Sequence, residues 1–282
     1  MDIAQIKKLR EETGAGMLDC KKALEASSGD YDLAKINLLN IYKLEGNSRV
    51  ASKGLCSIVV DENQAILFEV NAETDFVAKN EYFIKLIKEL GAHLVKSMAT
   101  NPKDALAVMI GDFTAKQQIM QTSLIIKENA QLRRFYRVIK DTTQGFGTYI
   151  HQGGKVVTLV ILSQNKQEIA DALAMQVAAN SPLYLDPETI DKDTLNYEKF
   201  MFEKEHQLYD NQLFLDHLKE ISLLSQPYIK NTEIKVSDLL ISNGINVIDF
   251  FRFELGQGIE NKLNCKLDIP CDGSSITVTP IY

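Results

Sequence analysis

Three carboxylates that lie close together in the sequence, Glu69, Glu73 and Asp75, are the first candidates for chemistry. Side chains alternate along a strand, so Glu69 and Glu73 could project from one face of a strand and of the residues that follow it. Such a pair could form the carboxylate site of an enzyme. However, no lysine, histidine or set of metal ligands is specified beside them, and a charged rim at the end of a strand is the more common explanation.

The other reactive residues do not form a recognisable site. The cysteines contain no CxxC pair, which favours free thiols, and they are Cys20, Cys56, Cys265 and Cys271. The histidines lack the i, i+4 spacing of a helical metal site, and they are His93, His151, His206 and His217. The phosphate-binding and nucleophile motifs GxxxxGK[ST], GxGxxG and GxSxG are also absent from the sequence. The sequence therefore predicts no metal, no cofactor and no enzymatic activity.

Charge and composition restrict the class of protein and its partners. The 282 residues include 31 Lys and Arg against 38 Asp and Glu, and the net charge is −7. Nucleic acid requires a basic surface, and none is visible, so direct binding to nucleic acid is not expected. No apolar run is long enough to span a bilayer, and the first residues have no apolar signal core. We therefore expect a cytoplasmic protein that does not bind membranes.

Residues 1–45 are predicted to form a three-helix N-terminal domain. Two glycines at residues 14 and 16 break the first helix, and Asp30 is a good N-cap for the third. The residues predicted to face inward are Ile3, Ile6, Leu9, Met17, Cys20, Ala23, Leu24, Leu33, Ala34 and Ile41. The polar and small residues 46–54 are predicted to be a linker.

Residues 55–260 are predicted to contain two copies of the same order of elements, β-β-α-α-β. The first half, 55–140, is expected to have strands at 55–60, 65–70 and 132–139, a helix capped by Asn80, and a second helix at 115–128. The second half, 141–260, is expected to have strands at 146–151, 155–162 and 247–255, and helices at 168–179 and 237–242. The two halves are expected to form one core, so the predicted fold class is α+β.

An acidic insertion, residues 187–229, interrupts the second half. Between residues 183 and 220 there are ten acids against four lysines, a charge of −6. Two helix-like stretches, 195–209 and 212–223, predict an antiparallel helical hairpin that projects from the core. Its apolar residues must pack together or against a partner, and they are Phe200, Phe202, Leu213, Phe214, Leu218 and Ile221. Residues 261–282 are predicted to be a C-terminal tail.

Two long segments of the chain resemble the bacterial translation elongation factor Ts family. One is Leu9-Arg-Glu-Glu-Thr-Gly-Ala-Gly-Met-Leu-Asp-Cys-Lys-Lys-Ala-Leu24, and the other is Glu69-Val-Asn-Ala-Glu-Thr-Asp-Phe-Val-Ala-Lys-Asn80. Weaker matches follow in the family's order at residues 174–179, 225–228 and 252–260, so the resemblance covers about residues 1–260. The hairpin looks shorter than in the best-known members, and the tail does not resemble their helical ending.

The resemblance implies a guanine nucleotide exchange factor that binds the GDP form of elongation factor Tu, displaces Mg²⁺ and promotes GDP release, so that GTP can bind. Thr74, Asp75, Phe76 and Val77 would displace the Mg²⁺ of the partner. The resemblance also implies that Arg10, Met17 and Leu18 contact the partner's GTPase domain and that His151 lies near the partner. It further implies that the N-terminal domain is similar to a ubiquitin-associated domain, and it leaves open a homodimer or a two-to-two complex.

Structural explanations exist for several of these residues. A Phe at a strand-to-helix junction is more often a core residue, and Asp75 would then be a capping or turn residue. Met17 and Leu18 could be partly buried in a small domain, His151 could be a surface residue beside a turn, and Cys20 is expected to be a small core residue. The alternative function is a scaffold that binds helices or peptides without acting on nucleotide exchange.

Overall fold

The computed structural model describes residues 3–13, 15–31, 33–35, 38, 51–206 and 210–259, without the side chains of 205 and 206. The prediction of an α+β fold is confirmed: helices accompany antiparallel sheets along the described chain. Among the described residues, no helix is both long and apolar enough to cross a membrane.

The N-terminal helices pack around a small apolar cluster. They are α1 (Ile3–Thr13) and α2 (Met17–Ala26), and residues 31, 33–35 and 38 are also helical. The predicted cap is confirmed, since Leu33 N donates to Asp30 Oδ1 at 3.0 Å. The buried residues of the cluster are Ile6, Leu9, Ala15, Cys20, Ala23, Leu24, Ala34 and Leu38.

Three residues of this unit that were predicted to face inward are exposed, and the prediction is wrong for them. Ile3, Met17 and Leu33 are 67%, 44% and 45% exposed. Ile3 and Met17 are the first residues of α1 and α2, and no preceding turn in the described part of the chain covers them. The prediction for Ile41 falls outside the described residues.

The first sheet has the order β1-β2-β5 and is antiparallel. Its strands are β1 (Lys53–Asp61), β2 (Gln64–Ala72) and β5 (Gln131–Ile139). The helix α4 (Glu81–Leu94) begins where predicted, because the Asn80 side chain accepts from Tyr82 N and Phe83 N. A Thr114–Gln117 capping box starts α6 (Ala115–Ile126).

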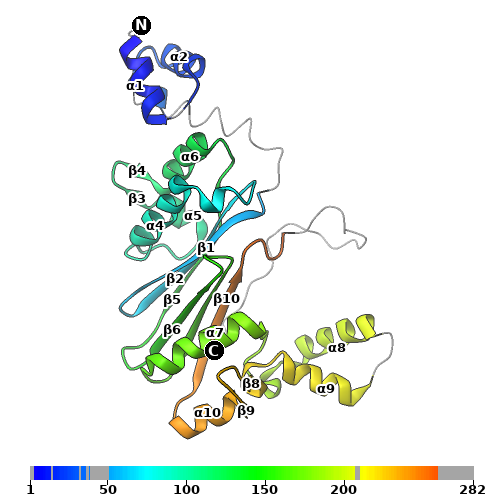
Figure 1. Cartoon of the computed structure of the whole chain (residues 1–282). Coiled ribbons are helices and arrows are strands. Elements are labelled where there is room, and N and C mark those ends of the chain that lie inside the picture. The colour runs from blue at the N-terminus through cyan, green and yellow to red at the C-terminus, as the bar shows by residue number, and fades with distance from the viewer. Residues whose placement is uncertain are drawn as a thin grey trace.

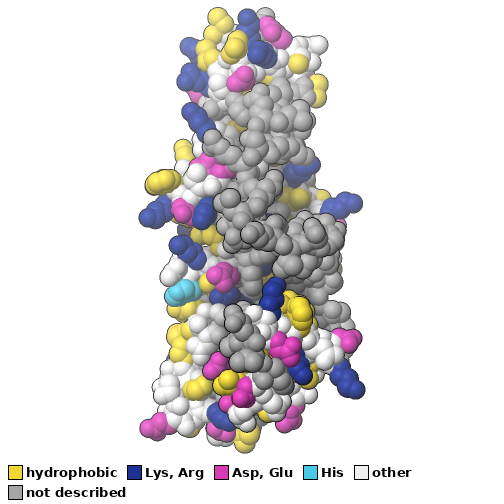
Figure 2. Space-filling model, turned by 90° about the vertical axis from the view of Figure 1, so that its right-hand side faces the viewer, with side chains coloured by type: hydrophobic (Ala, Val, Ile, Leu, Met, Phe, Trp, Pro, Cys, Tyr) yellow, Lys and Arg dark blue, Asp and Glu magenta, His cyan; other side chains and the backbone are white. Residues whose placement is uncertain are grey.

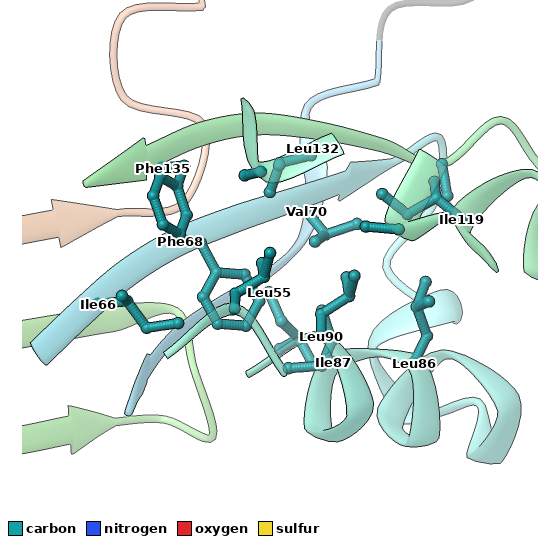
Figure 3. Packing of buried hydrophobic residues seen from close by; sticks show 14 of the residues in the cluster. Leu55, Ile66, Phe68, Val70, Leu86, Ile87, Leu90, Ile119, Leu132 and Phe135 are labelled. Atoms are coloured by element: carbon teal, nitrogen blue, oxygen red, sulfur yellow. The ribbon is translucent and has the colours of Figure 1, made fainter. Parts of the chain in front are cut away.

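The apolar residues of α4 recur at helical spacing and pack on one face of the first sheet. Phe83, Leu86, Ile87, Leu90 and Leu94 are buried, at the i, i+3, i+4 spacing of one apolar helix face. In Figure 3, Leu86, Ile87 and Leu90 point toward Leu55, Ile66, Phe68 and Val70 of the strands, with Ile119 of α6 beside them. Three short elements between α4 and α6 were not predicted: α5 (Pro102–Ala107), β3 (Met109–Ile110) and β4 (Phe113–Thr114).

The second sheet has the order β10-β7-β6 and is also antiparallel. Its strands are β6 (Gly145–His151), β7 (Val156–Leu162) and β10 (Val247–Glu254). The helices α7 (Gln167–Asn180) and α10 (Val236–Asn243) pack against it, and α10 ends at Gly244, which has φ +64. A small hairpin of β8 (Pro227–Tyr228) and β9 (Asn231–Lys235) was not predicted.

The central strands are buried on both faces, so the two sheets are stacked. Along β2, Ile66 and Phe68 belong to the cluster under α4, while Ala65 and Leu67 belong to the cluster between the sheets. Along β7, residues 157, 159 and 161 face the first sheet, and residues 160 and 162 face α7. This alternation gives four layers, with helices outside two sheets. Figure 1 shows α4 to α6 beside the first sheet and α7 beside the second.

The insertion forms a pair of helices that projects to the right in Figure 1, α8 (Lys192–His206) and α9 (Asn211–Glu220). Phe202, Phe214 and Leu218 pack between them, whereas Phe200 and Leu213 are 61% and 58% exposed. The Tyr184 hydroxyl donates to Glu198 Oε1 at 2.6 Å and fixes α8 to the segment after α7. Figure 2 faces this side of the molecule, where acidic and apolar side chains are mixed over the lower end.

Candidate partner-binding site

The loop of residues 73–80, the Phe76 loop, connects β2 to α4 and is fixed to the segment that precedes β5. Thr74 N and Thr74 Oγ1 donate to the Glu128 carboxylate at 2.9 and 2.5 Å. Asn129 N donates to Glu73 Oε1 at 3.2 Å. These bonds join residues more than fifty positions apart. They therefore fix the position of the loop on the core.

Phe76 and Val77 are adjacent but have opposite environments. Val77 begins the short 3₁₀-helix η1 (Val77–Lys79), is 3% exposed, and belongs to the core cluster under α4. Phe76 is 85% exposed. Burial of Val77 fixes the turn, and the preceding side chain must then point away from the core. The structure therefore contradicts the explanation of Phe76 as a core residue.

Asp75 lies beside Phe76 and is also exposed. Its carboxylate is 4.0 Å from Lys53 Nζ at the start of β1, and 74% of its side chain is accessible. An ion pair this long and this exposed contributes little to stability. Asp75 therefore presents a negative charge next to the protruding aromatic ring.

The three carboxylates considered for an enzyme site do not share a site. Glu69 is completely buried and is bonded to Arg133 and Arg134, Glu73 is bonded to Asn129, and Asp75 lies at the surface. Their alternation along the chain does not bring them together, because Glu69 points into the molecule. Within the described part of the chain, no group of three or more His, Cys, Asp or Glu side chains could hold a metal ion.

The two described thiols are core residues. Cys20 is buried, as predicted, and burial raises the pKa of its thiol. Burial, with the nearby Glu69 carboxylate as a second cause, raises the pKa of the Cys56 thiol to about 12. Since the thiolate is the nucleophile, neither residue is suited to covalent chemistry at neutral pH.

We expect Cys56 to resist alkylation in the native protein at pH 8 and to react only after unfolding. Its raised pKa leaves almost no thiolate, and β1 is covered by β2 and the second sheet. Treatment with iodoacetamide, followed by peptide mass spectrometry with and without denaturant, measures this. Rapid labelling of the native protein at Cys56 would show instead that β1 opens locally.

The N-terminal unit presents a second set of exposed residues. Arg10 on α1 is exposed, and at the start of α2 Met17 and Leu18 are 44% and 63% exposed. Two adjacent residues at the first turn of a helix point in different directions, and here neither enters the cluster formed by Leu9, Cys20 and Leu24. The unit therefore places two apolar side chains and a cation at its surface.

His151 lies at the end of β6, in the hairpin that leads to β7. It is exposed, and its ring centroid is 6.0 Å from that of Tyr149. The hairpin is docked on the first sheet, because Cys56 N donates to Gly154 O at 2.7 Å. Lys53, which faces Asp75, is three residues from Cys56, about 10 Å along the strand. The structure thus brings His151 and the Phe76 loop toward the same end of β1.

Sequence reasoning missed the residues that fix the Phe76 loop. Glu128 and Asn129 follow α6 and contact the loop only through the tertiary fold. Glu128 lies after Lys127, which ends α6 in the left-handed conformation at φ 58. That conformation turns the chain so that Glu128 reaches Thr74, and the local sequence contains no signal for it.

The fold and the site define a stacked α+β protein with a fixed loop from which an aromatic side chain protrudes beside a carboxylate. Residues 73–257 match the family model described as "Elongation factor TS". The chain is 38% identical to elongation factor Ts of Acholeplasma laidlawii, with 93% of this chain and 94% of the relative covered. It is 36% identical to that of Phytoplasma australiense (89% and 96% covered) and 35% identical to that of Lactiplantibacillus plantarum (94% and 95%).

The chain belongs to the elongation factor Ts family. It is therefore a translation elongation factor of protein biosynthesis and not an enzyme. The resemblance carried by residues 9–24 and 69–80 is confirmed.

Proposed function

We propose that this chain is a guanine nucleotide exchange factor that binds the GDP form of elongation factor Tu, displaces its Mg²⁺ and promotes GDP release. The observation that carries the proposal is the exposure of Phe76 on a loop whose two sides are fixed, by Thr74–Glu128 on one side and by buried Val77 on the other. A loop whose backbone is already fixed loses little conformational freedom on binding.

The proposed mechanism requires no bond to be made or broken. In a P-loop GTPase, Mg²⁺ is held by P-loop and switch side chains and bridges phosphate oxygens of the nucleotide. Phe76 inserts between helices of the partner and shifts the segment that carries the metal ligands, while Asp75 places a carboxylate beside it. The factor binds the nucleotide-free partner more tightly than the GDP form, and by linkage GDP then binds the partner less tightly.

Two further contacts complete the proposed interface. Arg10, Met17 and Leu18 of the N-terminal unit, which is similar to a ubiquitin-associated domain, contact the GTPase domain of the partner. His151 contacts the partner from the second sheet.

The proposed domain organisation follows the chain from its N-terminal unit to its tail. The domains are residues 1–45, a linker at 46–54, core halves at 55–140 and 141–260 with the 187–229 hairpin, and a tail at 261–282.

The setting of the proposed function is the cytoplasm. The partner is a protein, and the acidic net charge of −7 is unfavourable for direct binding to nucleic acid. The factor itself uses no cofactor and no metal of its own, since the Mg²⁺ that it displaces belongs to the partner.

Release of labelled GDP from elongation factor Tu, with and without this protein, tests the proposal. Acceleration of release by substoichiometric protein is the expected result. Tight binding without acceleration would overturn exchange in favour of the scaffold, and absence of binding would contradict both.

The charge of the hairpin predicts how salt affects self-association, in a homodimer or a two-to-two complex. Hydrogen bonds from Lys219 and Gln212 hold the pKa of Asp216 below its usual value, and those from Thr194 do the same for Asp191. These acids stay ionised at neutral pH, so two hairpins side by side repel, most strongly at low salt. We expect self-association through the hairpin to strengthen with added salt in sedimentation experiments. A dimer that tightens at low salt would place the acids away from the contact.

A further inference from the structure

Glu69 is a completely buried carboxylate whose two oxygens are saturated by donors from distant parts of the chain. Glu69 Oε2 accepts from Arg134 Nε at 2.6 Å and from Arg133 Nη1 at 3.1 Å. Glu69 Oε1 accepts from Arg133 Nη1 at 3.2 Å and from Gly256 N at 2.9 Å. A buried charge is stable only with partners of this quality, because removal from water is costly. We call Glu69, Arg133 and Arg134 the Glu69 cluster.

A β-bulge allows two consecutive arginines to reach one carboxylate. In the register of β2 and β5, Glu69 faces Arg134 but Val70 faces Leu132, so Arg133 is the extra residue. In a regular strand the side chains of residues 133 and 134 would point to opposite faces. The bulge redirects one of them, which is a common role of bulges near functional sites.

The same arginines hold the turn that follows β10. Arg134 Nη2 donates to Glu254 O at 2.7 Å, and Arg133 Nη2 donates to Gln257 O at 2.5 Å. The Arg134 guanidinium also lies 4.3 Å from the centre of the Phe253 ring. Gly256 has φ +76, and a Cβ at this position would lie 2.9 Å from Ser52 O. The turn therefore fits closely between Glu69 and the start of β1.

We infer that Glu69 is a positioning residue for nucleotide exchange: with Arg133 and Arg134 it fixes the end of β10 to the strands that carry the Phe76 loop, so that both sheets meet the partner as one body. This inference rests on the proposed function. Phe76 projects from the first sheet and His151 from the second. Their relative position must be held if both are to engage the partner at once.

Glu69 contributes to the affinity of this protein for the partner and does not position the Phe76 loop itself. The loop is held by hydrogen bonds with Glu128 and Asn129 and by the burial of Val77, whereas the Glu69 carboxylate is bonded to Arg133, Arg134 and Gly256. Loss of the cluster would let the end of β10 and the second sheet move relative to the first. The partner would then have to select the correct arrangement, which lowers its apparent affinity.

Glu69→Gln tests this inference, because it keeps the size of the side chain but leaves two guanidinium groups without a counter-charge. GDP release is measured at increasing concentrations of the variant. The half-saturating concentration is expected to rise about tenfold, as for the loss of preorganisation at an interface. The limiting rate at saturation is expected to change by less than about twofold.

A matched control separates positioning from general stability. Gln176 is also fully buried, and its side chain is hydrogen-bonded to Gln226, Pro227 and Ile229, on the side of the second sheet away from Glu69. Gln176→Met should lower the melting temperature but leave the half-saturating concentration within about twofold of wild type. The role of Glu69 would be overturned if the half-saturating concentration rose equally for both variants. It would also be overturned if Glu69→Gln lowered the limiting rate of GDP release instead.

Amide hydrogen exchange provides a test that needs no partner and no variant. In the wild-type protein, the Gly256 amide is expected to be as protected as the amides of β2, because it donates to a buried carboxylate. Rapid exchange of the Gly256 amide would show that the turn after β10 is not fixed by Glu69. If the wild-type protein failed to accelerate GDP release, both the proposed function and the role of Glu69 in exchange would be wrong. If the wild-type protein is active and Glu69→Gln has the same half-saturating concentration, only the role of Glu69 would be wrong.

Discussion

Phe76→Ala is expected to abolish most of the exchange activity while leaving the protein as stable as before. The ring is 85% exposed, so its removal should change the free energy of unfolding by no more than about 0.5 kcal/mol. Truncation of a hot-spot residue at the centre of an interface costs about 2 kcal/mol or more. Because the proposed mechanism spends this energy on displacing the metal, the limiting rate of GDP release should fall about thirtyfold. Thermal unfolding and release of labelled GDP at saturating factor measure the two quantities.

Phe200→Ala is the matched control for this experiment. It makes the same chemical change at a ring that is also mostly exposed, at 61%, but on α8 rather than on the Phe76 loop. Stability should again be unchanged, and GDP release should stay within about twofold of wild type. A Phe76→Ala protein that melts many degrees lower but exchanges nucleotide normally once folded would overturn the assignment of Phe76.

Phe68→Ala is expected to have the opposite result, although it lies only eight residues earlier. Phe68 is completely buried under α4 and belongs to the core cluster between this helix and the first sheet. Loss of a buried phenylalanine ring costs about 3–5 kcal/mol through lost burial and the cavity that remains. For a chain of this size the melting temperature should fall by about 10 °C. Calorimetry or circular dichroism at increasing temperature measures the change.

The exchange activity of Phe68→Ala, corrected for the folded fraction, should match that of wild type. Phe68 has no exposed surface and therefore no direct contact with a partner. Phe68→Leu is a useful intermediate, because it fills part of the cavity and should cost less than the alanine variant. Nearly unchanged stability of Phe68→Ala would show that α4 collapses onto the sheet and fills the space.

Local patterns in the sequence were sufficient to predict the elements on each side of the Phe76 loop. The helix α4 follows its cap at Asn80 and buries residues at helical spacing, because caps and periodicity depend on neighbours within a few positions. The same patterns were insufficient for Ile3, Met17 and Leu33. These residues fit an apolar stripe, but none of the elements that the structure describes buries them.

The sequence by itself determined the family, the mixed α+β fold and the segment that contains the candidate site, since these depend on motifs and on periodicity along the chain. Only the tertiary structure decided that Phe76 points outward while Val77 is buried. It also decided that the Glu69 carboxylate is paired with two arginines and does not form a site with Glu73. The physical reason is that burial and charge pairing depend on segments far apart in the chain. Glu128 reaches Thr74 across 54 positions, and Gly256 reaches Glu69 across 187.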